Sequence, residues 1–166
     1  MTASRAKRHI FSYFKEPGGS AEMDVDGSSN AINFKVTAPA YGELNAVLVN
    51  FVISDGGIGF GEFAGLGAAL TNGLEIKWFD SADAELLDFT DGLNIKTNEE
   101  FGALSGADAV IQPAAGDDSL PIRWTIQKSG LAPKIASGDY LQITVQDDLT
   151  NITKFRAMMQ GYIADD

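Results

Sequence analysis

Residues 139–163, DYLQITVQDDLTNITKFRAMMQGYI, contain two runs in which apolar and polar side chains alternate. In the first run Leu141, Ile143 and Val145 are separated by single polar residues, and the run from Phe155 to Ile163 follows the same period. Successive side chains of a strand point to opposite faces, so this period predicts two strands that each bury one face. The Asp and Asn residues between the runs favour a turn. We therefore predict a long antiparallel hairpin.

Further apolar or alternating runs predict strands through the rest of the chain, at residues 32–36, 44–53, 74–79, 86–89 and 120–126. The run at 44–53 is apolar at both parities, which predicts a strand covered on both faces. The runs at 74–79 and 86–89 flank a turn at residues 80–83 and predict a second hairpin. This spacing of strands and turns indicates an all-β fold, an antiparallel β-sandwich that we expect to be jelly-roll-like.

Two short helices are expected between these strands. Phe63, Leu66 and Leu70 have helical spacing and precede a glycine that suits a helix end. Thr97 and Glu100 have the spacing of a capping box, which predicts a second helix that begins at this point. Residues 105–119 are rich in Gly, Ala and Asp and are expected to form a loop.

The first thirty residues differ in composition from the rest of the chain. They begin with a basic and aromatic stretch and continue with the linker-like segments 17–20 and 27–30. We predict an extended N-terminal arm at residues 1–30 and a sandwich domain at residues 31–166. Extended chain rises ~3.3 Å per residue, so fifteen to thirty residues span roughly 50–100 Å and can reach a neighbouring molecule.

Charge and aromatic content suggest what this arm contacts. The chain has 12 basic and 23 acidic residues, and the first fifteen residues hold four bases and no acid. The remainder therefore has 8 basic and 23 acidic residues, a net charge of −15. Such a body repels nucleic acid and anionic membranes, whereas a basic arm can dock on another copy of it. The expected partner-binding residues are Arg5, Lys7, Arg8, Ile10, Phe11, Tyr13 and Phe14.

The sequence offers little catalytic or cofactor chemistry, and we expect a protein that is not an enzyme and has no cofactor. There is no cysteine, and His9 is the sole histidine. A Ser-His-Asp triad or a histidine metal site within the body is therefore excluded. The segment 55–73 holds seven glycines but no lysine, so it is not a P-loop, and no βαβ pattern surrounds the glycines at 59–64.

Aspartate pairs leave one metal hypothesis open. Asp147 and Asp148 with Asp139 nearby, Asp117 with Asp118, or Asp80 with Asp83 could bind calcium through carboxylate oxygens. No pair matches an EF-hand loop, and aspartates in turns most often stabilise the turn itself. A membrane span or a secretory signal is not evident, so we expect a protein made in the cytoplasm and not exported by the general pathway.

Residues 73–161 resemble small virion proteins of tailed bacteriophages. The resemblance rests on Leu74-Glu75-Ile76, Asp88-Phe89-Thr90-Asp91-Gly92, Ile95-Lys96-Thr97-Asn98, Arg123-Trp124-Thr125, Gly138-Asp139-Tyr140, Val145-Gln146-Asp147-Asp148-Leu149-Thr150 and Phe155-Arg156. It implies a jelly-roll or sandwich protein of the capsid exterior, a cement or decoration protein located in the virion. Its partners would be the major capsid protein and copies of itself, with a homo-oligomer on the particle.

Two other functions remain open at this point. One is a different position in the virion, such as a head–tail connector, tail or spike protein. The other is a carbohydrate-binding sandwich, which would need an exposed aromatic platform. Tyr140, Trp78 and Trp124 are the candidates for such a platform, although both tryptophans fall on the parity that we expect to be buried.

Overall fold

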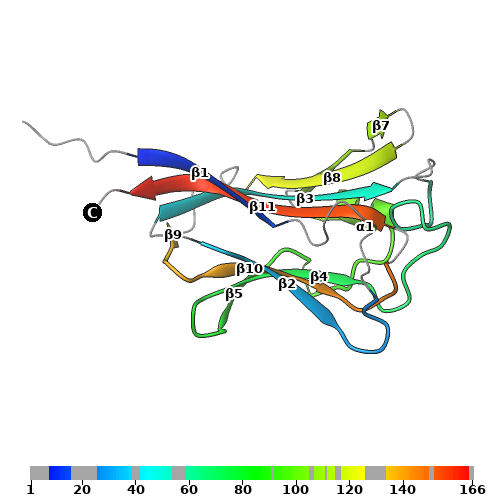
Figure 1. Cartoon of the computed structure of the whole chain (residues 1–166), viewed down its shortest axis with the longest axis horizontal. Helices are drawn as coiled ribbons and strands as arrows, with labels where there is room; N and C mark the ends of the chain where they lie inside the picture. The colour runs from blue at the N-terminus through cyan, green and yellow to red at the C-terminus, as the bar shows by residue number, and fades with distance from the viewer. Residues whose placement is uncertain are drawn as a thin grey trace, which may run out of the picture.

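The computed structural model defines two antiparallel β-sheets, one short helix and their connections (Figure 1). The residues that it describes are 8–15, 26–38, 42–53, 59–90, 92–104, 107–110, 112–114, 117–125, 134–149 and 152–164. Within these ranges, no helix has both the length and the apolar character needed to cross a lipid bilayer.

The two sheets lie face to face as the layers of a sandwich (Figure 1). The seven-stranded sheet consists of β1 Arg8–Lys15, β11 Ile152–Ala164, β3 Gly42–Ile53, β8 Asp117–Thr125 and β6 Ala107–Ala109, with β7 Gln112–Ala114 paired to β8 and β9 Lys134–Ile135 paired to β3. The four-stranded sheet consists of β2 Ile32–Thr37, β10 Tyr140–Val145, β4 Leu74–Phe79 and β5 Glu85–Asp88.

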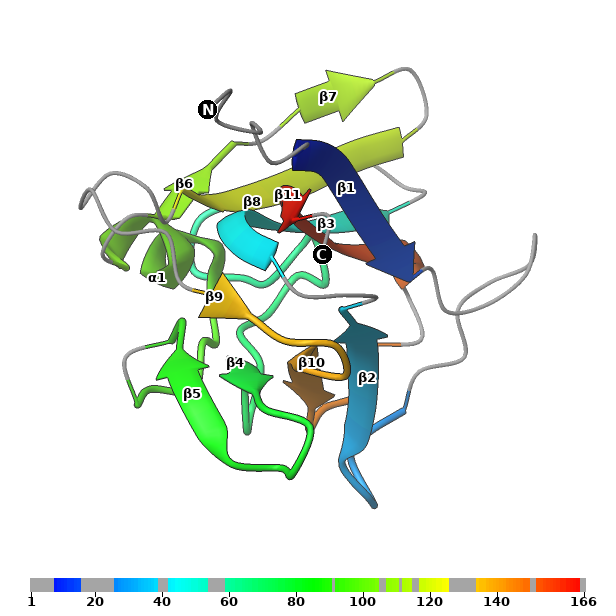
Figure 2. The same cartoon turned by 90° about the vertical axis from the view of Figure 1, so that its left-hand side faces the viewer.

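The main strands pair in a nested order. β1 pairs with β11, β2 with β10, β3 with β8 and β4 with β5, in each case antiparallel. Leaving aside the short strands β6, β7 and β9, the first strand thus pairs with the last, the second with the next to last, and so on inward. Successive pairs alternate between the two sheets (Figure 2). This is the arrangement of a jelly roll, which confirms the predicted all-β sandwich and its jelly-roll form.

The predicted hairpin at residues 139–163 is wrong in its pairing. Both strands exist, but β10 pairs with β2 and β4 in one sheet, whereas β11 pairs with β1 and β3 in the other. The connection at 146–151 therefore crosses between the layers. Period-two alternation indicates which face of a strand is buried, but it does not indicate which other strand is its hydrogen-bonded neighbour. The hairpin predicted at 74–89 is confirmed, because β4 and β5 are antiparallel neighbours.

Residues 8–15 belong to the sandwich. They form β1, which pairs along its length with β11, from Arg8 opposite Ala164 to Lys15 opposite Ala157. The predicted arm at 1–30 is therefore wrong for residues 8–15, and the described part of the sandwich begins at Arg8. The physical reason is that β11 without β1 would leave a row of backbone donors and acceptors unpaired. Residues 1–7 and 16–25 lie outside the described ranges.

Apolar side chains from both sheets fill the space between the layers. Leu141 and Ile143 on β10 face this core, as do Val49 on β3 and Ile122 on β8. All four are fully buried. Neighbouring strands place further core residues beside them: Ile143 lies opposite both Phe34 and Ile76. The alternation predicted for these strands is thus confirmed where the structure describes their side chains.

Of the two expected helices, one is found in the described ranges. α1 Asn98–Ala103 begins after Thr97 and has the capping box with Glu100 that the spacing predicts. It lies beside β6 at one side of the sandwich (Figure 2) and places Phe101 in the core. The loop expected at 105–119 contains the short strands β6 and β7, both paired with β8.

The helix predicted from Phe63, Leu66 and Leu70 is wrong. Residues 59–73 form a series of turns with positive φ at Gly61, Ala64, Gly65, Gly67 and Gly73. A left-handed backbone conformation interrupts a right-handed helix, and glycine adopts this conformation with little strain. Phe63 and Leu70 are nevertheless buried in the core. Their apolar character therefore correctly indicates that they are buried, whereas the glycines determine the backbone conformation.

We predict that two N-terminal deletions have different effects on stability. Removal of residues 2–7 leaves every described strand intact, so the free energy of unfolding should change little. Removal of residues 2–16 deletes β1 and exposes the edge of β11. With net contributions of about 0.5–1.5 kcal/mol per hydrogen bond, this loss should reach several kcal/mol. Urea unfolding of the two variants and the intact chain measures both values. Equal stability of all three would contradict the assignment of β1 to the sandwich.

Candidate functional site

The expected partner-binding residues divide into two groups. Arg5 and Lys7 lie outside the described residues. The other five, Arg8, Ile10, Phe11, Tyr13 and Phe14, lie on β1, of which the structure describes the backbone. β1 is the terminal strand of its sheet and has β11 as its one neighbour among the described strands. Its other edge is the side on which a further strand could be added.

The carboxylate of Asp147 connects segments that are far apart in the sequence. Its Oδ1 accepts hydrogen bonds from the backbone N–H groups of Thr71 (2.8 Å) and Asn72 (3.1 Å). Its Oδ2 accepts from Asn72 (3.0 Å) and Gly73 (2.7 Å). The backbone carbonyl of Asp147 also accepts from the N–H of Gly27 at 2.9 Å. Asp147 therefore fixes the segment before β2, the segment before β4 and the connection between β10 and β11.

The hydrogen bonds of two candidate aspartates show what each does in the fold. The buried carboxylate of Asp147 is occupied by backbone donors, and Asp80 accepts from Ala82 and Ala84 at 2.8 Å each. Both residues stabilise turns. No group of three or more His, Cys, Asp or Glu residues in the described ranges is arranged to hold a metal ion. The side chains of Asp117 and Asp118 lie outside the described part.

A shallow pocket of about 410 Å³ lies beside this cluster. Leu66, Ala68, Ala69 and Leu70 supply its apolar wall, and Ser28, Thr71, Asn72, Asp147 and Asp148 supply its polar wall. Asp26 and Asp148 form a β-bridge next to it. A hydrogen bond from the Ser28 hydroxyl holds the pKa of Asp26 below its usual value, so this carboxylate is ionised near neutral pH.

The glycine-rich segment displays Phe60 on a turn with many hydrogen bonds. Phe60 lies between Gly59 and Gly61, and its side chain is 94% exposed. The N–H of Gly59 donates to the carboxylate of Glu62, and the N–H of Gly61 donates to Oε1 of Glu99 at 2.8 Å. The amides on either side of Phe60 are thus both bonded to carboxylates.

Asn98 attaches the same turn to the start of α1. Its side chain accepts from the N–H of Ala64 at 2.8 Å and donates to the carbonyl of Gly59 at 3.0 Å. Its own N–H donates to the carbonyl of Glu62 at 2.9 Å. Both polar atoms of the amide are therefore used, and the first residues of the glycine-rich segment are held against the helix.

The aromatic platform that carbohydrate binding requires is not exposed at the expected residues. Trp78 and Trp124 are each 3% exposed and face the core. Their indole N–H groups are buried and have no hydrogen-bond partner in the described structure. Tyr140 lies on the outer face, but its ring stacks on Phe79 at 5.3 Å and has the ammonium of Lys35 4.0 Å above it. A sugar ring would have to displace one of these neighbours.

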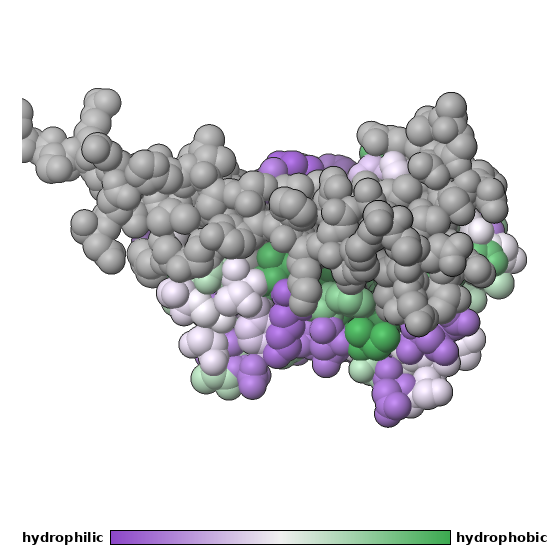
Figure 3. Space-filling model, in the orientation of Figure 1, coloured by the Kyte–Doolittle hydropathy of each residue, from purple (hydrophilic) through white to green (hydrophobic). Residues whose placement is uncertain are grey.

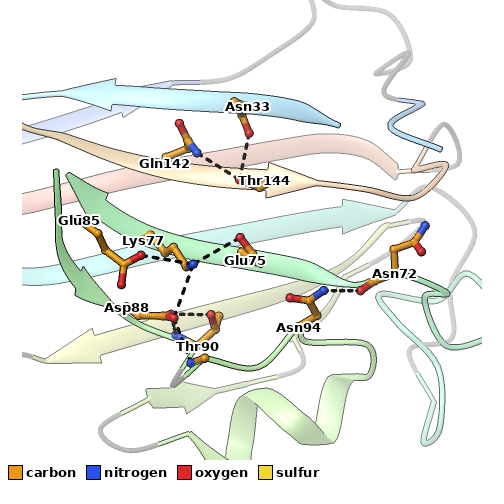
Figure 4. A network of polar contacts seen from close by, with 11 residues as sticks. Asn33, Asn72, Glu75, Lys77, Glu85, Asp88, Thr90, Asn94, Gln142 and Thr144 are labelled. Atoms are coloured by element: carbon orange, nitrogen blue, oxygen red, sulfur yellow. Dashed lines mark hydrogen bonds and ion pairs between the residues drawn. The ribbon is translucent and has the colours of Figure 1, made fainter. Parts of the chain in front are cut away.

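Polar side chains cover the outer face of the four-stranded sheet. Lys77 lies between three carboxylates, at 3.6 Å from Glu75, 3.4 Å from Glu85 and 3.9 Å from Asp88 (Figure 4). Partial burial lowers the pKa of Lys77, and the three carboxylates more than offset this effect and raise it overall. Figure 3, which views the sandwich edge-on, shows hydrophilic side chains on the described part of this layer with some apolar side chains between them. Lys77 and its three carboxylates thus make this part of the outer face polar.

No family model matches this chain. No curated protein matches it either. The fold and the described surfaces therefore carry the functional argument.

Sequence reasoning missed the two features that organise this end of the sandwich. Asp147 was considered as a turn residue or calcium ligand, and its donors lie more than seventy residues away in the chain. Phe60 was treated as part of a glycine-rich loop, and no role was assigned to its side chain. One available signal was the aromatic residue between two glycines, because such a residue has few local side chains to cover it.

We predict that Asp147→Asn lowers the free energy of unfolding by about 2–3 kcal/mol, because it replaces a charged acceptor and brings an amide N–H₂ toward backbone donors. Asp148→Asn at the exposed neighbouring position is the matched control and should lower stability by less than Asp147→Asn does, because solvent reaches this side chain. Chemical denaturation of both variants measures the difference. A loss at Asp147 no greater than that at Asp148 would contradict the anchoring role.

We also predict different effects for alanine at two glycines that share a positive φ. At Gly92 (φ 74°) an added Cβ meets open space, so the cost should be about 1–2 kcal/mol from the left-handed backbone. At Gly73 (φ 94°) the Cβ would lie 2.9 Å from the carbonyl oxygen of Ile95. Gly73→Ala should therefore destabilise the fold by a further ~1–3 kcal/mol. Thermal unfolding of the pair tests this, and equal losses would show that the backbone at Gly73 has room to move.

Proposed function

We propose that this chain is a non-enzymatic structural protein of a virus particle, a cement or decoration protein on the capsid of a tailed bacteriophage. The observation that carries the proposal is the nested strand order, because jelly rolls are a common architecture of viral capsid proteins. The segment that resembles phage virion proteins contributes β4, β5, β8 and β10 and most of β11 to this fold. A fold does not define a function, so the surfaces must be considered as well.

The other common uses of a jelly roll receive less support. Lectins need an accessible binding surface, and the aromatic rings that could form one are either in the core or covered, as at Tyr140. An enzyme site needs polar groups that converge in a cavity. Between the described parts of the two sheets, the facing side chains form a continuous apolar cluster. These features favour a protein that acts through its outer surfaces.

In this proposal the chain reinforces the shell by adding contacts between neighbouring subunits. The partners are the major capsid protein and further copies of the chain. The basic residues Arg5 and Lys7, which precede β1, would meet acidic surface on a neighbour. The edge of β1 opposite β11, which is unpaired among the described strands, offers backbone groups for a further strand. The net charge of −11 disfavours nucleic acid as a partner.

We predict that purified particles of the virus that encodes this chain contain it in proportion to the capsid subunits. Quantitative mass spectrometry of the particles measures this ratio. Particles assembled without the chain should lose their DNA at lower temperature or milder osmotic shock, because contacts between subunits are missing.

Two results would change the proposal. A small fixed number of copies per particle would place the chain at a head–tail connector, tail or spike. Complete absence from purified particles would contradict a structural role in the virion.

A further inference from the structure

Phe60 is the most exposed large apolar residue in the described part of the chain, at 94%. A single exposed apolar side chain requires no explanation by itself. Phe60 differs because the backbone on both sides of it is fixed: Gly59 and Gly61 donate to Glu62 and Glu99. The ring is thus displayed on a prearranged support, which reduces the entropy lost when a partner binds.

The support of this turn includes a strained residue. Ala64 has φ 45°, in the left-handed region that non-glycine residues seldom adopt. The amide of Asn98 bonds both Ala64 and Gly59 and maintains this geometry. Gly61 has open space where a Cβ would be, so a partner can approach the backbone beside the ring. Strain held in place by surrounding contacts is common at binding sites.

The charges around the turn define the chemistry of a partner. The carboxylates of Glu62 and Glu99 bind the amides on either side of Phe60. Hydrogen bonds from backbone amides, its own first, hold the pKa of Glu99 below its usual value. The sequence contains no Lys or Arg between Lys35 and Lys77, and the ammonium of Lys96 donates to the carbonyl of Thr71 at 2.7 Å. An aromatic face flanked by carboxylates suits a guanidinium or ammonium group, which can lie over the ring and pair with the acids.

The chain itself contains one segment with this chemistry. Residues 1–8 hold three basic residues, Arg5, Lys7 and Arg8, and no acid. We propose that the Phe60 turn binds the basic amino-terminal segment of a second copy of this chain, with Arg5 or Lys7 over the ring of Phe60 and the neighbouring carboxylates as its counter-charges. The contact rests on the proposed function in one respect only, namely that copies of the chain lie side by side on the shell.

The dimensions of the sandwich favour a second copy over the same molecule. β1 begins at Arg8, opposite the last residue of β11, whereas the glycine-rich segment is tied to Asp147, just before β11 begins. The segment 59–73 accordingly lies toward the end of the sandwich opposite the start of β1 (Figure 1). The 13 residues of β11 span roughly 43 Å at ~3.3 Å each. Seven residues before Arg8 reach at most ~25 Å.

Titration of the isotope-labelled full chain with a synthetic peptide of residues 1–8, followed by NMR, tests this proposal. The amide signals of Gly59 and Gly61 should shift with increasing peptide and follow a weak dissociation constant, on the order of 10 mM. Phe60→Leu keeps an apolar side chain but removes the ring, and should weaken binding about two- to five-fold. Glu99→Gln keeps an acceptor for Gly61 and should weaken binding and reduce its dependence on salt.

Three controls make the result decisive. A peptide with Arg5→Ala and Lys7→Ala should cause no shift. Leu93→Ala, at another exposed apolar residue (63% exposed), should bind the peptide as the unmodified chain does. Unchanged thermal unfolding of Phe60→Leu and Glu99→Gln shows that both variants are folded.

Each other outcome overturns the proposal. If the peptide causes no shift at Gly59 and Gly61, or if Phe60→Leu binds as tightly as the unmodified chain, the turn is not the binding site. If shifts appear only along the edge of β1, the segment docks there instead. Because these measurements use the purified chain, they are independent of the particle analysis: absence from the virion would reject the proposed function and leave the peptide result standing.

Discussion

One buried carboxylate determines how the loops at one end of the sandwich are arranged. Asp147 accepts hydrogen bonds from three consecutive backbone amides, Thr71, Asn72 and Gly73, and its own carbonyl accepts from Gly27. A buried carboxylate without such partners would be strongly destabilising, so the fold is stable only when these segments come together. The same contacts hold the end of the glycine-rich segment in place, and α1 holds its beginning through Asn98. Phe60 lies within the part that Asn98 holds, between Gly59 and Ala64.

The sequence predicts the faces of the strands better than it predicts their partners. Alternation around Leu141 and Ile143 correctly indicates one buried and one outer face, because the order of apolar and polar residues within a single strand is enough to identify its buried face. The pairing of β10 with β2 and β4 depends on residues about a hundred and about seventy positions away, respectively. A turn that joins two strands of one sheet and a connection that crosses between sheets can have the same Asp- and Asn-rich composition. The predicted hairpin failed for this reason.

Local backbone chemistry was predictable where it depends on a few neighbouring residues. The capping box of Thr97 and Glu100 is an example, since both partners lie within one helical turn. The helix expected around Phe63 shows the opposite case, because glycines with positive φ override apolar spacing. β1 was missed because its basic and aromatic residues, followed by Pro and Gly, have the composition of an arm. Its place in the sheet follows from β11, which is more than a hundred residues away.

The contact that we infer at Phe60 is weak when considered singly, and this is consistent with a role on a shell. A cation over an exposed ring contributes about 0.5–1 kcal/mol, and an exposed ion pair contributes at most about 1 kcal/mol. Copies in dilute solution would therefore separate readily. In the proposed assembly on a particle, neighbouring copies would be held at a fixed spacing, so each contact would form at a high effective concentration and many contacts would act together. A contact between the basic end of one copy and the acidic turn of the next is also heterologous, and it closes into a ring only where the shell imposes a rotation axis. The underlying symmetry of the capsid, rather than the strength of the individual contact, would then determine how many copies assemble.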